Sequence, residues 1–296
     1  MKKFDRYTLV GLGGIIGSAV LFGLMPLFTK MAYAHGWNMW TVSWGRFAFG
    51  AVMALAALLV RDRSFPVPDR GQFRALLPTA AVYATVPILL YGSYNYIASG
   101  LATTLNCTYP VFVILLGALF CGKKATPRQL LCLLLCLAGT ALLYTPGGTS
   151  GLAGIVMGVL SAVGYAGYVV LSDNTGIRDM DPLCVAFYLM LAASVIIGAA
   201  GLIAGQMTFR GTDAFGFFMT VMLALTSGVL ALTLYQIGIQ HVGGILTSLL
   251  STFEPVTGVI VGILVFEEML TGRILTGVIL IIISTVLLVL AGGKPS

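Results

Sequence analysis

Residues 249–265 read LLSTFEPVTGVIVGILV, an apolar run that holds a carboxylate, Glu254, directly before a proline, Pro255. Glu254 is the only charged residue between Asp213 and Glu267. A charge at the centre of a bilayer is costly, and a proline removes one backbone hydrogen bond from a helix. Both are tolerated where the helix faces a polar cavity rather than lipid. This stretch therefore predicts an interrupted membrane helix that borders a polar cavity.

The composition of the whole chain predicts an all-α integral membrane protein. Hydrophobic residues make up 58% of the 296 residues and charged residues 9%, against roughly a quarter charged in soluble domains. About 20 mostly apolar residues cross a bilayer as one helix, and such stretches follow one another along this chain without the alternation of a membrane barrel. We predict ten transmembrane helices, at residues 8–34, 39–60, 75–96, 99–121, 129–145, 152–172, 182–203, 214–239, 245–266 and 274–292.

The basic residues indicate the orientation of these helices, because short loops rich in lysine and arginine stay in the cytoplasm. Two of them, Arg210 and Arg273, fall on one side of the membrane and twelve on the other. We therefore predict a multi-pass protein of the plasma (inner) membrane with both termini in the cytoplasm. The net charge of +6 belongs to loops rather than to one basic face, which argues against a nucleic-acid partner. The twelve are Lys2, Lys3, Arg6, Arg61, Arg63, Arg70, Arg74, Lys123, Lys124, Arg128, Arg178 and Lys294.

Part of the sequence repeats. A shift of 145 residues aligns LATTLNCTYPVFVILLGAL with LTSLLSTFEPVTGVIVGIL, so that Pro110 meets Pro255. We predict two five-helix repeats, residues 1–148 and 149–296. Because five is an odd number, the second repeat enters the membrane in the opposite sense, as in the inverted repeats of many secondary transporters. Their substrates bind near the midplane between the repeats, beside interrupted helices such as those predicted at Pro110 and Pro255.

Charged residues on three predicted helices are candidates for binding or coupling. At 1.5 Å per residue, Glu254 lies roughly 14 Å deep and the backbone of Arg46 differs from it by only several Å. These opposite charges either form an ion pair or bind the two ends of one solute. Lys30 lies nearer the outer end of the first helix, where it either snorkels to the interface or takes part in coupling.

Further polar residues are predicted to line the same cavity. Pro255 removes the amide that would bond the Ser251 carbonyl, and Pro110 does the same for the Asn106 carbonyl. The polar stripes that these residues begin on the ninth and fourth helices are predicted to face each other. Aromatic faces that keep a hydroxyl suit an amine or a ring, although each such residue has a structural alternative as a bond between helices. The remaining candidates are Tyr83, Tyr91, Tyr109 and Gln236.

Several motifs resemble those of the EamA-type branch of the drug/metabolite transporter superfamily, over almost the whole chain. They are FGLMPLFTK (22–30), WGRF (44–47), a tyrosine 14 residues before a helix proline (Tyr96 to Pro110), FEPV (253–256) and FEE (266–268). The first half departs from this pattern. Tyr109 occupies the position that corresponds to Glu254, and Lys123 occupies the position that corresponds to Glu268. The resemblance implies ten helices in two halves and secondary transport of small metabolites, often amino acids or amines moved outward.

These observations favour an alternating-access carrier of a small polar metabolite, an amino acid or related amine, that acts as an exporter. In this hypothesis Arg46 holds the carboxylate of the solute, and Glu254 holds its ammonium group or a coupled proton. The alternative is a proton-coupled carrier of organic cations, with Arg46 committed elsewhere. The sequence shows no metal-ligand cluster, no cofactor motif and no nucleophile–base pair, which argues against a membrane enzyme. A structural bundle is disfavoured by a carboxylate at the midplane.

Overall fold

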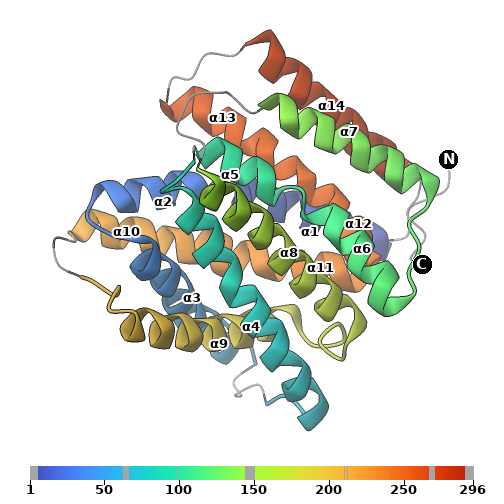
Figure 1. The fold of residues 1–296 in the computed structure, drawn as a ribbon. Coiled ribbons are helices and arrows are strands. Elements are labelled where there is room, and N and C mark those ends of the chain that lie inside the picture. The colour runs from blue at the N-terminus through green and yellow to red at the C-terminus, as the bar shows by residue number, and fades with distance from the viewer. Residues whose placement is uncertain are drawn as a thin grey trace.

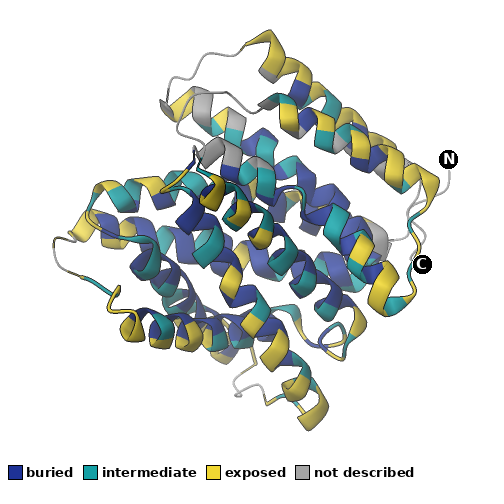
Figure 2. Cartoon of the chain, viewed as in Figure 1, coloured by how far each residue is buried: buried dark blue, intermediate teal, exposed yellow. Residues whose placement is uncertain are grey.

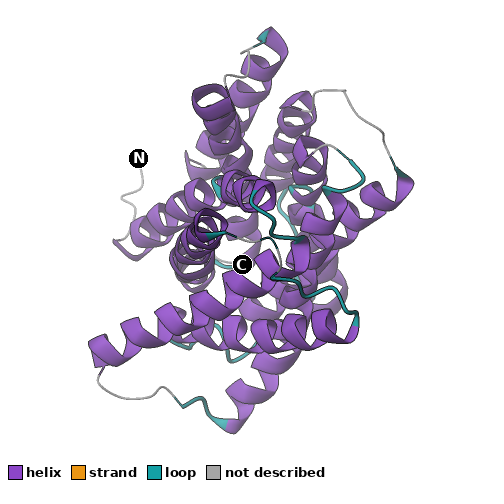
Figure 3. Ribbon diagram, turned by 90° about the vertical axis from the view of Figure 1, so that its left-hand side faces the viewer, coloured by secondary structure: helices purple, strands orange, loops and turns teal. Residues whose placement is uncertain are grey.

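A computed structural model describes residues 6–62, 67–97, 99–143, 151–209, 211, 213–266 and 271–290. The regular secondary structure of these residues is entirely helical, and the helices form one bundle (Figures 1 and 3). The predicted all-α class is confirmed. The segments are α1 (Arg6–Gly23), α2 (Met25–Ala34), α3 (Met39–Asp62), α4 (Arg70–Ser93), α5 (Ser99–Asn106), α6 (Tyr109–Cys121), α7 (Pro127–Leu143), α8 (Leu152–Asn174), α9 (Pro182–Ile203), α10 (Ala214–Leu223), the π-helical η1 (Ala224–Leu230), α11 (Ala231–Val242), α12 (Gly244–Leu250), the 3-10 turn η2 (Ser251–Phe253), α13 (Glu254–Phe266) and α14 (Gly272–Leu290).

Within the described residues, each predicted span falls on one helix or on consecutive helical segments; residues 144–145 and 291–292, at the ends of two predicted spans, lie outside these residues. Six stretches of the described chain are long and apolar enough to cross a membrane, so this is a multi-pass membrane protein. The other predicted spans coincide with shorter apolar segments, α5–α6, α7, α12–α13 and α14, and the count of ten remains a prediction. The six stretches are Leu9–Ala34, Met39–Asp62, Arg70–Ser93, Leu152–Asn174, Pro182–Ile203 and Ala214–Val242.

The most extensive contacts join helices that are far apart in the sequence. α1 packs against α11, α3 against α9, and α4 against α8. α7 and α14 pack against each other along one edge of the molecule (Figure 1). Each of these pairs joins a helix of the first half of the chain to one of the second half. The two halves are therefore intertwined rather than folded as separate lobes.

The surface of the bundle suits lipid. Buried residues follow the inward faces of the central helices, and exposed residues follow the outer faces, above all on α7 and α14 (Figure 2). Many exposed side chains are large and apolar, such as Val52, Leu119 and Ile203, whose exposed fractions are 69%, 75% and 89%. Apolar surface on this scale is rare on soluble monomers, whereas it is expected on helices that face acyl chains.

Three predicted spans are broken into separate segments beside a proline. The break between α1 and α2 precedes Pro26, that between α5 and α6 precedes Pro110, and that between α12 and α13 precedes Pro255. At the last break, η2 lets the Glu254 amide donate to the Ser251 carbonyl. The prediction of a free carbonyl at Ser251 is therefore wrong. The chain tightens into a 3-10 turn, which supplies a donor one residue earlier than an α-helix would.

At one end of the bundle, a contact between Asp213 and His35 joins the two halves of the chain. Asp213 caps α10, because its Oδ1 accepts the Gly216 amide at 2.8 Å. Its Oδ2 lies 2.6 Å from Nδ1 of His35, at the end of α2. The hydrogen bond from Gly216 and the contact with His35 hold the pKa of Asp213 below its ordinary value. Asp213 is therefore ionised at neutral pH and is lost as a partner only under acid conditions.

Candidate solute-binding site

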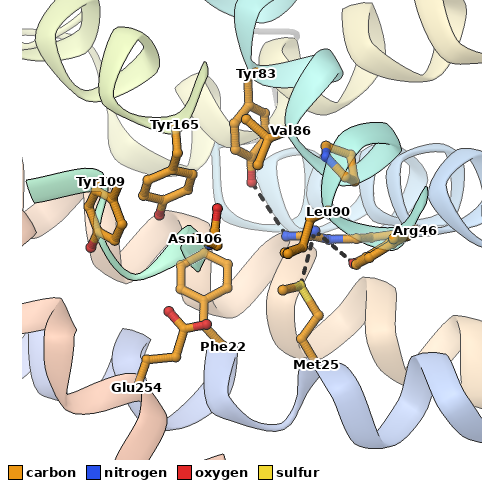
Figure 4. Close-up of a pocket in the computed structure, with 12 residues that line it drawn as sticks. Phe22, Met25, Arg46, Tyr83, Val86, Leu90, Asn106, Tyr109, Tyr165 and Glu254 are labelled. Carbon is orange, nitrogen blue, oxygen red and sulfur yellow. Dashed lines mark hydrogen bonds between the residues drawn. The ribbon is translucent and has the colours of Figure 1, made fainter. Parts of the chain in front are cut away.

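A small cavity lies between α1–α6, α8 and α13 (Figure 4). The candidate residues that line it are Arg46, Tyr83, Tyr91, Asn106, Tyr109 and Glu254. The rest of its wall consists of Phe22, Met25, Val86, Pro87, Leu90 and Tyr165. Opposite charges and several hydroxyl groups, contributed by both halves of the chain, therefore share one small cavity.

Arg46 is held in this cavity by neutral partners. Its side chain is buried, and its Nη1 donates to the hydroxyl of Tyr91 at 3.1 Å. Its Nη2 donates to the carbonyl of Ser227 at 3.1 Å and to the hydroxyl of Tyr83 at 3.4 Å. The guanidinium also lies over the ring of Phe47, with Cζ 5.2 Å from the ring centroid. These contacts fix the orientation of Arg46 without neutralising its charge.

Glu254, the first residue of α13, is also buried. The ion pairs of the described residues do not include one between Glu254 and Arg46. In Figure 4 the Glu254 side chain extends toward Phe22, whose ring centroid lies 6.0 Å from Cζ of Arg46. Of the two arrangements predicted for these charges, direct pairing is not seen. They remain on separate sides of a shared cavity.

The fourth and ninth predicted spans meet beside the cavity. The Tyr109 hydroxyl donates to the Ser248 carbonyl of α12 at 3.2 Å. Asn106 accepts from the Ser161 hydroxyl of α8 at 3.0 Å, which fixes its amide. The Tyr109 ring packs edge-on against Tyr165, with centroids 4.6 Å apart. Tyrosines from several helices thus form an aromatic wall along one side of the cavity.

Three predicted candidates do not line the cavity. Ser251 is buried one turn before Glu254. Gln236 is also buried, and its Nε2 donates to the Tyr168 hydroxyl at 2.9 Å and to Ser172 at 3.4 Å. Lys30 is exposed on α2. The structure therefore brings six of the candidates together, places Ser251 and Gln236 in the adjoining core, and leaves Lys30 at the surface.

The cavity is too small for a metabolite in this conformation. Its volume is about 20 Å³, and roughly 10–15 Å³ is needed to hold one water molecule. A solute of several non-hydrogen atoms therefore requires the surrounding helices to move apart. The charged and hydroxyl-bearing side chains are already gathered, so such a movement would enlarge a polar space rather than create one.

The other six lining residues were not among the candidates predicted from the sequence, and two of them lie at a helix break. Phe22 and Met25 flank the break between α1 and α2, and the Sδ of Met25 lies 3.3 Å from Nη1 of Arg46. Apolar residues in an apolar chain carry no pattern that separates lipid-facing from cavity-facing positions. The one available signal was the break that Pro26 introduces.

Close packing at Gly23 positions Glu254, and this contact yields a stability prediction. A Cβ on Gly23 would lie 2.5 Å from the Cβ of Thr257 and 2.8 Å from the Glu254 carbonyl oxygen. We expect Gly23→Ala to push α1 away from α13 and to lower the free energy of unfolding by about 1–3 kcal/mol, the usual cost of overpacking. Thermal unfolding of the purified protein measures this change.

A glycine on the same helix provides the control. A Cβ on Gly13 would meet nothing within 4 Å, and alanine is favoured over glycine in a helix by about 1 kcal/mol. Gly13→Ala is therefore expected to leave the unfolding temperature unchanged or to raise it. Equal unfolding temperatures for Gly23→Ala and the unsubstituted protein would show that α1 and α13 are not in tight contact.

Comparison with known proteins identifies relatives along most of the chain. A family model described as the EamA-like transporter family matches residues 9–145 and again residues 152–290. The "Uncharacterized inner membrane transporter YedA" of Escherichia coli (strain K12) is 26% identical over 261 residues, covering 87% of this chain and 83% of the relative. The "Uncharacterized transporter sll1319" of Synechocystis sp. is 28% identical over 221 residues, covering 71% and 64%.

A plant protein and a solved structure are also similar. The "Phosphoenolpyruvate/phosphate translocator 1, chloroplastic" of Oryza sativa subsp. japonica is 27% identical over 183 residues, covering 58% of this chain and 44% of that protein. A protein crystal structure superposes with a TM-score of 0.80 at 17% identity, covering 97% of this chain and 99% of its own. At this identity the likeness concerns the fold alone.

Proposed function

Because the chain belongs to the EamA-like transporter family, we propose that it carries a small zwitterionic metabolite, an amino acid or a related amine that keeps a carboxylate, across the plasma membrane. The family and the relatives named as transporters make it a membrane transporter rather than an enzyme. The proposal extends this statement to the class of substrate, to secondary active transport by alternating access, and to export as the direction.

The observation that carries the substrate class is the separation of two buried opposite charges across one cavity. Arg46 and Glu254 both line it, yet no ion pair between them is present among the described residues. Unpaired charge is costly in a membrane interior. An amino acid carries a carboxylate and an ammonium group a few atoms apart. A solute of this kind, placed between the two side chains, offers each of them its opposite charge.

Each side chain keeps capacity for a solute. The Nε of Arg46 has no partner among the described residues, so the guanidinium retains a donor for a carboxylate. The Glu254 carboxylate accepts an ammonium group, or a proton when no ammonium group is present, which provides a route to proton coupling. Tyr109 and Tyr165 then face the side chain of the solute with their aromatic wall.

The small volume of the cavity supports alternating access. A space of about 20 Å³ corresponds to a closed state around the site, since it holds about one water molecule. Solute entry from either side therefore requires the lining helices to separate. A carrier that exposes the same site to one side at a time meets this requirement.

The helix contacts support the proposed inverted repeat of residues 1–148 and 149–296. In this division, α1 and α8 are the first helices of the two repeats, and α4 and α11 belong to the third spans. The contact between α1 and α11 therefore corresponds to the contact between α8 and α4. Both contacts are among the most extensive in the bundle. The other two extensive contacts join helices at the same position in their repeats: α3 and α9 are the second spans, and α7 and α14 are the fifth. The two successive matches of one family model fit the same division. An inverted repeat provides two related conformations, which alternating access uses.

One observation favours a second candidate, a proton-coupled carrier of organic cations. Arg46 already donates to Tyr83, Tyr91 and the Ser227 carbonyl, which satisfies most of its donors without a solute. Glu254 and the tyrosines would then act as a cage for an ammonium group. In both candidates Glu254 repels an anion, so the substrates in the name of the Oryza relative are not expected here.

Uptake of a mixed metabolite pool by proteoliposomes tests the proposal. The pool contains amino acids, amines without a carboxylate, and phosphorylated acids, and mass spectrometry measures what accumulates with and without a pH gradient. We expect zwitterionic amino acids to accumulate above the level in empty liposomes. Accumulation of phosphorylated acids, or no accumulation by protein shown to be folded, would contradict the proposal.

A further inference from the structure

A buried carboxylate lies outside the cavity, at the end of α8. The side chain of Asp173 is only 4% exposed, and its Oδ2 lies 2.5 Å from Nζ of Lys123. Its Oδ1 lies 3.3 Å from Nη1 of Arg178. Lys123 comes from the loop after α6 and Arg178 from the loop after α8, so the contact joins the two halves of the chain. We call Lys123, Asp173 and Arg178 the Asp173 cluster.

The Asp173 cluster rests on the junction between α11 and α12. Gly243 forms this junction with a φ of 84°, a conformation that favours glycine. A Cβ on Gly244 would lie 3.0 Å from the Cβ of Asp173. Arg178 also approaches the Gln240 carbonyl of α11, at 3.5 Å. The cluster therefore fixes the start of α12, the segment that leads through η2 to Glu254.

Buried polar side chains connect the cluster to the cavity along one face of α8. Tyr165 lines the cavity, and its ring lies 5.4 Å from that of Tyr168, one turn further on. Gln236 then bridges the hydroxyls of Tyr168 and Ser172, and Ser172 precedes Asp173. From Tyr165 to Asp173 this path covers about 12 Å at 1.5 Å per residue.

One buried oxygen on this path is unpaired. The Gln236 side chain is buried, and its Oε1 has no hydrogen-bond partner among the described residues. Buried polar atoms of native proteins are almost always paired, and an unpaired one costs about 1–3 kcal/mol. The unpaired Gln236 Oε1 therefore indicates that water or solute pairs with it when the bundle opens there.

We propose that the Asp173 cluster is the inner gate of the transport route, and that the route runs from the cavity past Tyr168, Gln236 and Ser172 to this gate. The proposal rests on the proposed function, since a gate requires a carrier. A buried ion pair adds little net stability, so a role in switching accounts better for its position. Lys123 and Arg178 are 20% and 33% exposed, so both can turn to water when the gate opens. In this structure the gate is closed.

Chemical labelling of a thiol placed on the route tests the gate without any solute. The reporter is Ser172→Cys, an isosteric change at a fully buried position, in a chain whose five native cysteines are replaced by alanine. A charged methanethiosulfonate is applied to the cytoplasmic face of inside-out vesicles. We expect Asp173→Asn to raise the labelling rate about tenfold, because loss of one member of a buried ion pair weakens the closed arrangement.

Matched variants make the outcome decisive. Asp179→Asn removes a carboxylate from the same loop at an exposed position and is expected to leave the labelling rate unchanged. Lys123→Gln breaks the cluster from its other side, and is used if Asp173→Asn fails to fold. Equal rates in a folded cluster variant and in the parent would overturn the gate. A raised rate in a protein that transports other solutes but no zwitterionic amino acid would keep the gate and reject the proposed substrate class.

Discussion

Glu254→Gln is expected to reduce the initial rate of amino acid uptake by roughly 10- to 100-fold, because the solute loses a hydrogen bond to a charged group. Glutamine keeps the size of the side chain but cannot hold an ammonium group or exchange a proton. Glu254 lies in the cavity without an ion-pair partner among the described residues, so the change should leave folding nearly intact. The measurement is uptake by proteoliposomes that contain equal amounts of folded protein.

The pH gradient separates the two roles of Glu254. If this carboxylate carries the coupled proton, the residual uptake of Glu254→Gln no longer responds to the gradient. Asp69→Asn is the matched control, because Asp69 is an exposed N-cap of α4 and asparagine caps helices equally well. A Glu254→Gln protein with full uptake and full sensitivity to the gradient would show that Glu254 has a structural role only.

Arg46→Lys is expected to impair both stability and recognition of a carboxylate. Lysine keeps the charge but lacks the planar fork that holds Tyr83, Tyr91 and the Ser227 carbonyl together. We expect the free energy of unfolding to fall by about 2 kcal/mol, and uptake of amino acids to fall by about 100-fold because two-point binding of the carboxylate is lost. Thermal unfolding and uptake per folded molecule measure the two effects separately.

The exposed Arg70 at the start of α4 provides the control for this exchange. Arg70→Lys keeps the same chemistry on the surface and is expected to change neither quantity. If Arg46→Lys lowers the unfolding temperature but leaves amino acid uptake per folded molecule unchanged, Arg46 serves only to hold the helices. The carrier of organic cations would then be the better account.

The centre of the site could be predicted because polar groups are rare in this chain. A charge within an apolar helix has few favourable surroundings, so Arg46 and Glu254 had to face a partner or a cavity. Prolines next to polar residues marked Pro110 and Pro255 as positions where the helices break. The structure places these breaks beside the cavity that Tyr109 and Glu254 line.

Contacts between distant residues could not be predicted. Gln236 was expected in the cavity, but it pairs with Tyr168, a contact between α11 and α8 that no local pattern records. Ser251 has its carbonyl bonded because a 3-10 turn replaces the expected α-helical geometry. Lys123 was interpreted as a basic loop residue at the position that corresponds to Glu268, and its contact with Asp173, 50 residues further along the chain, was not predicted. Its role depends on how the two halves pack, which one sequence does not specify.

Competition between three related compounds tests the central claim, that Arg46 and Glu254 bind the two ends of one zwitterion, most directly. The compounds are the amino acid that the proteoliposomes accumulate best, the amine left by removal of its carboxylate, and its N-acetylated acid. Each is added at equal concentration to labelled amino acid uptake. Our account predicts that only the intact amino acid competes strongly. Equal competition by the amine would contradict it, because Arg46 would then contribute nothing to recognition.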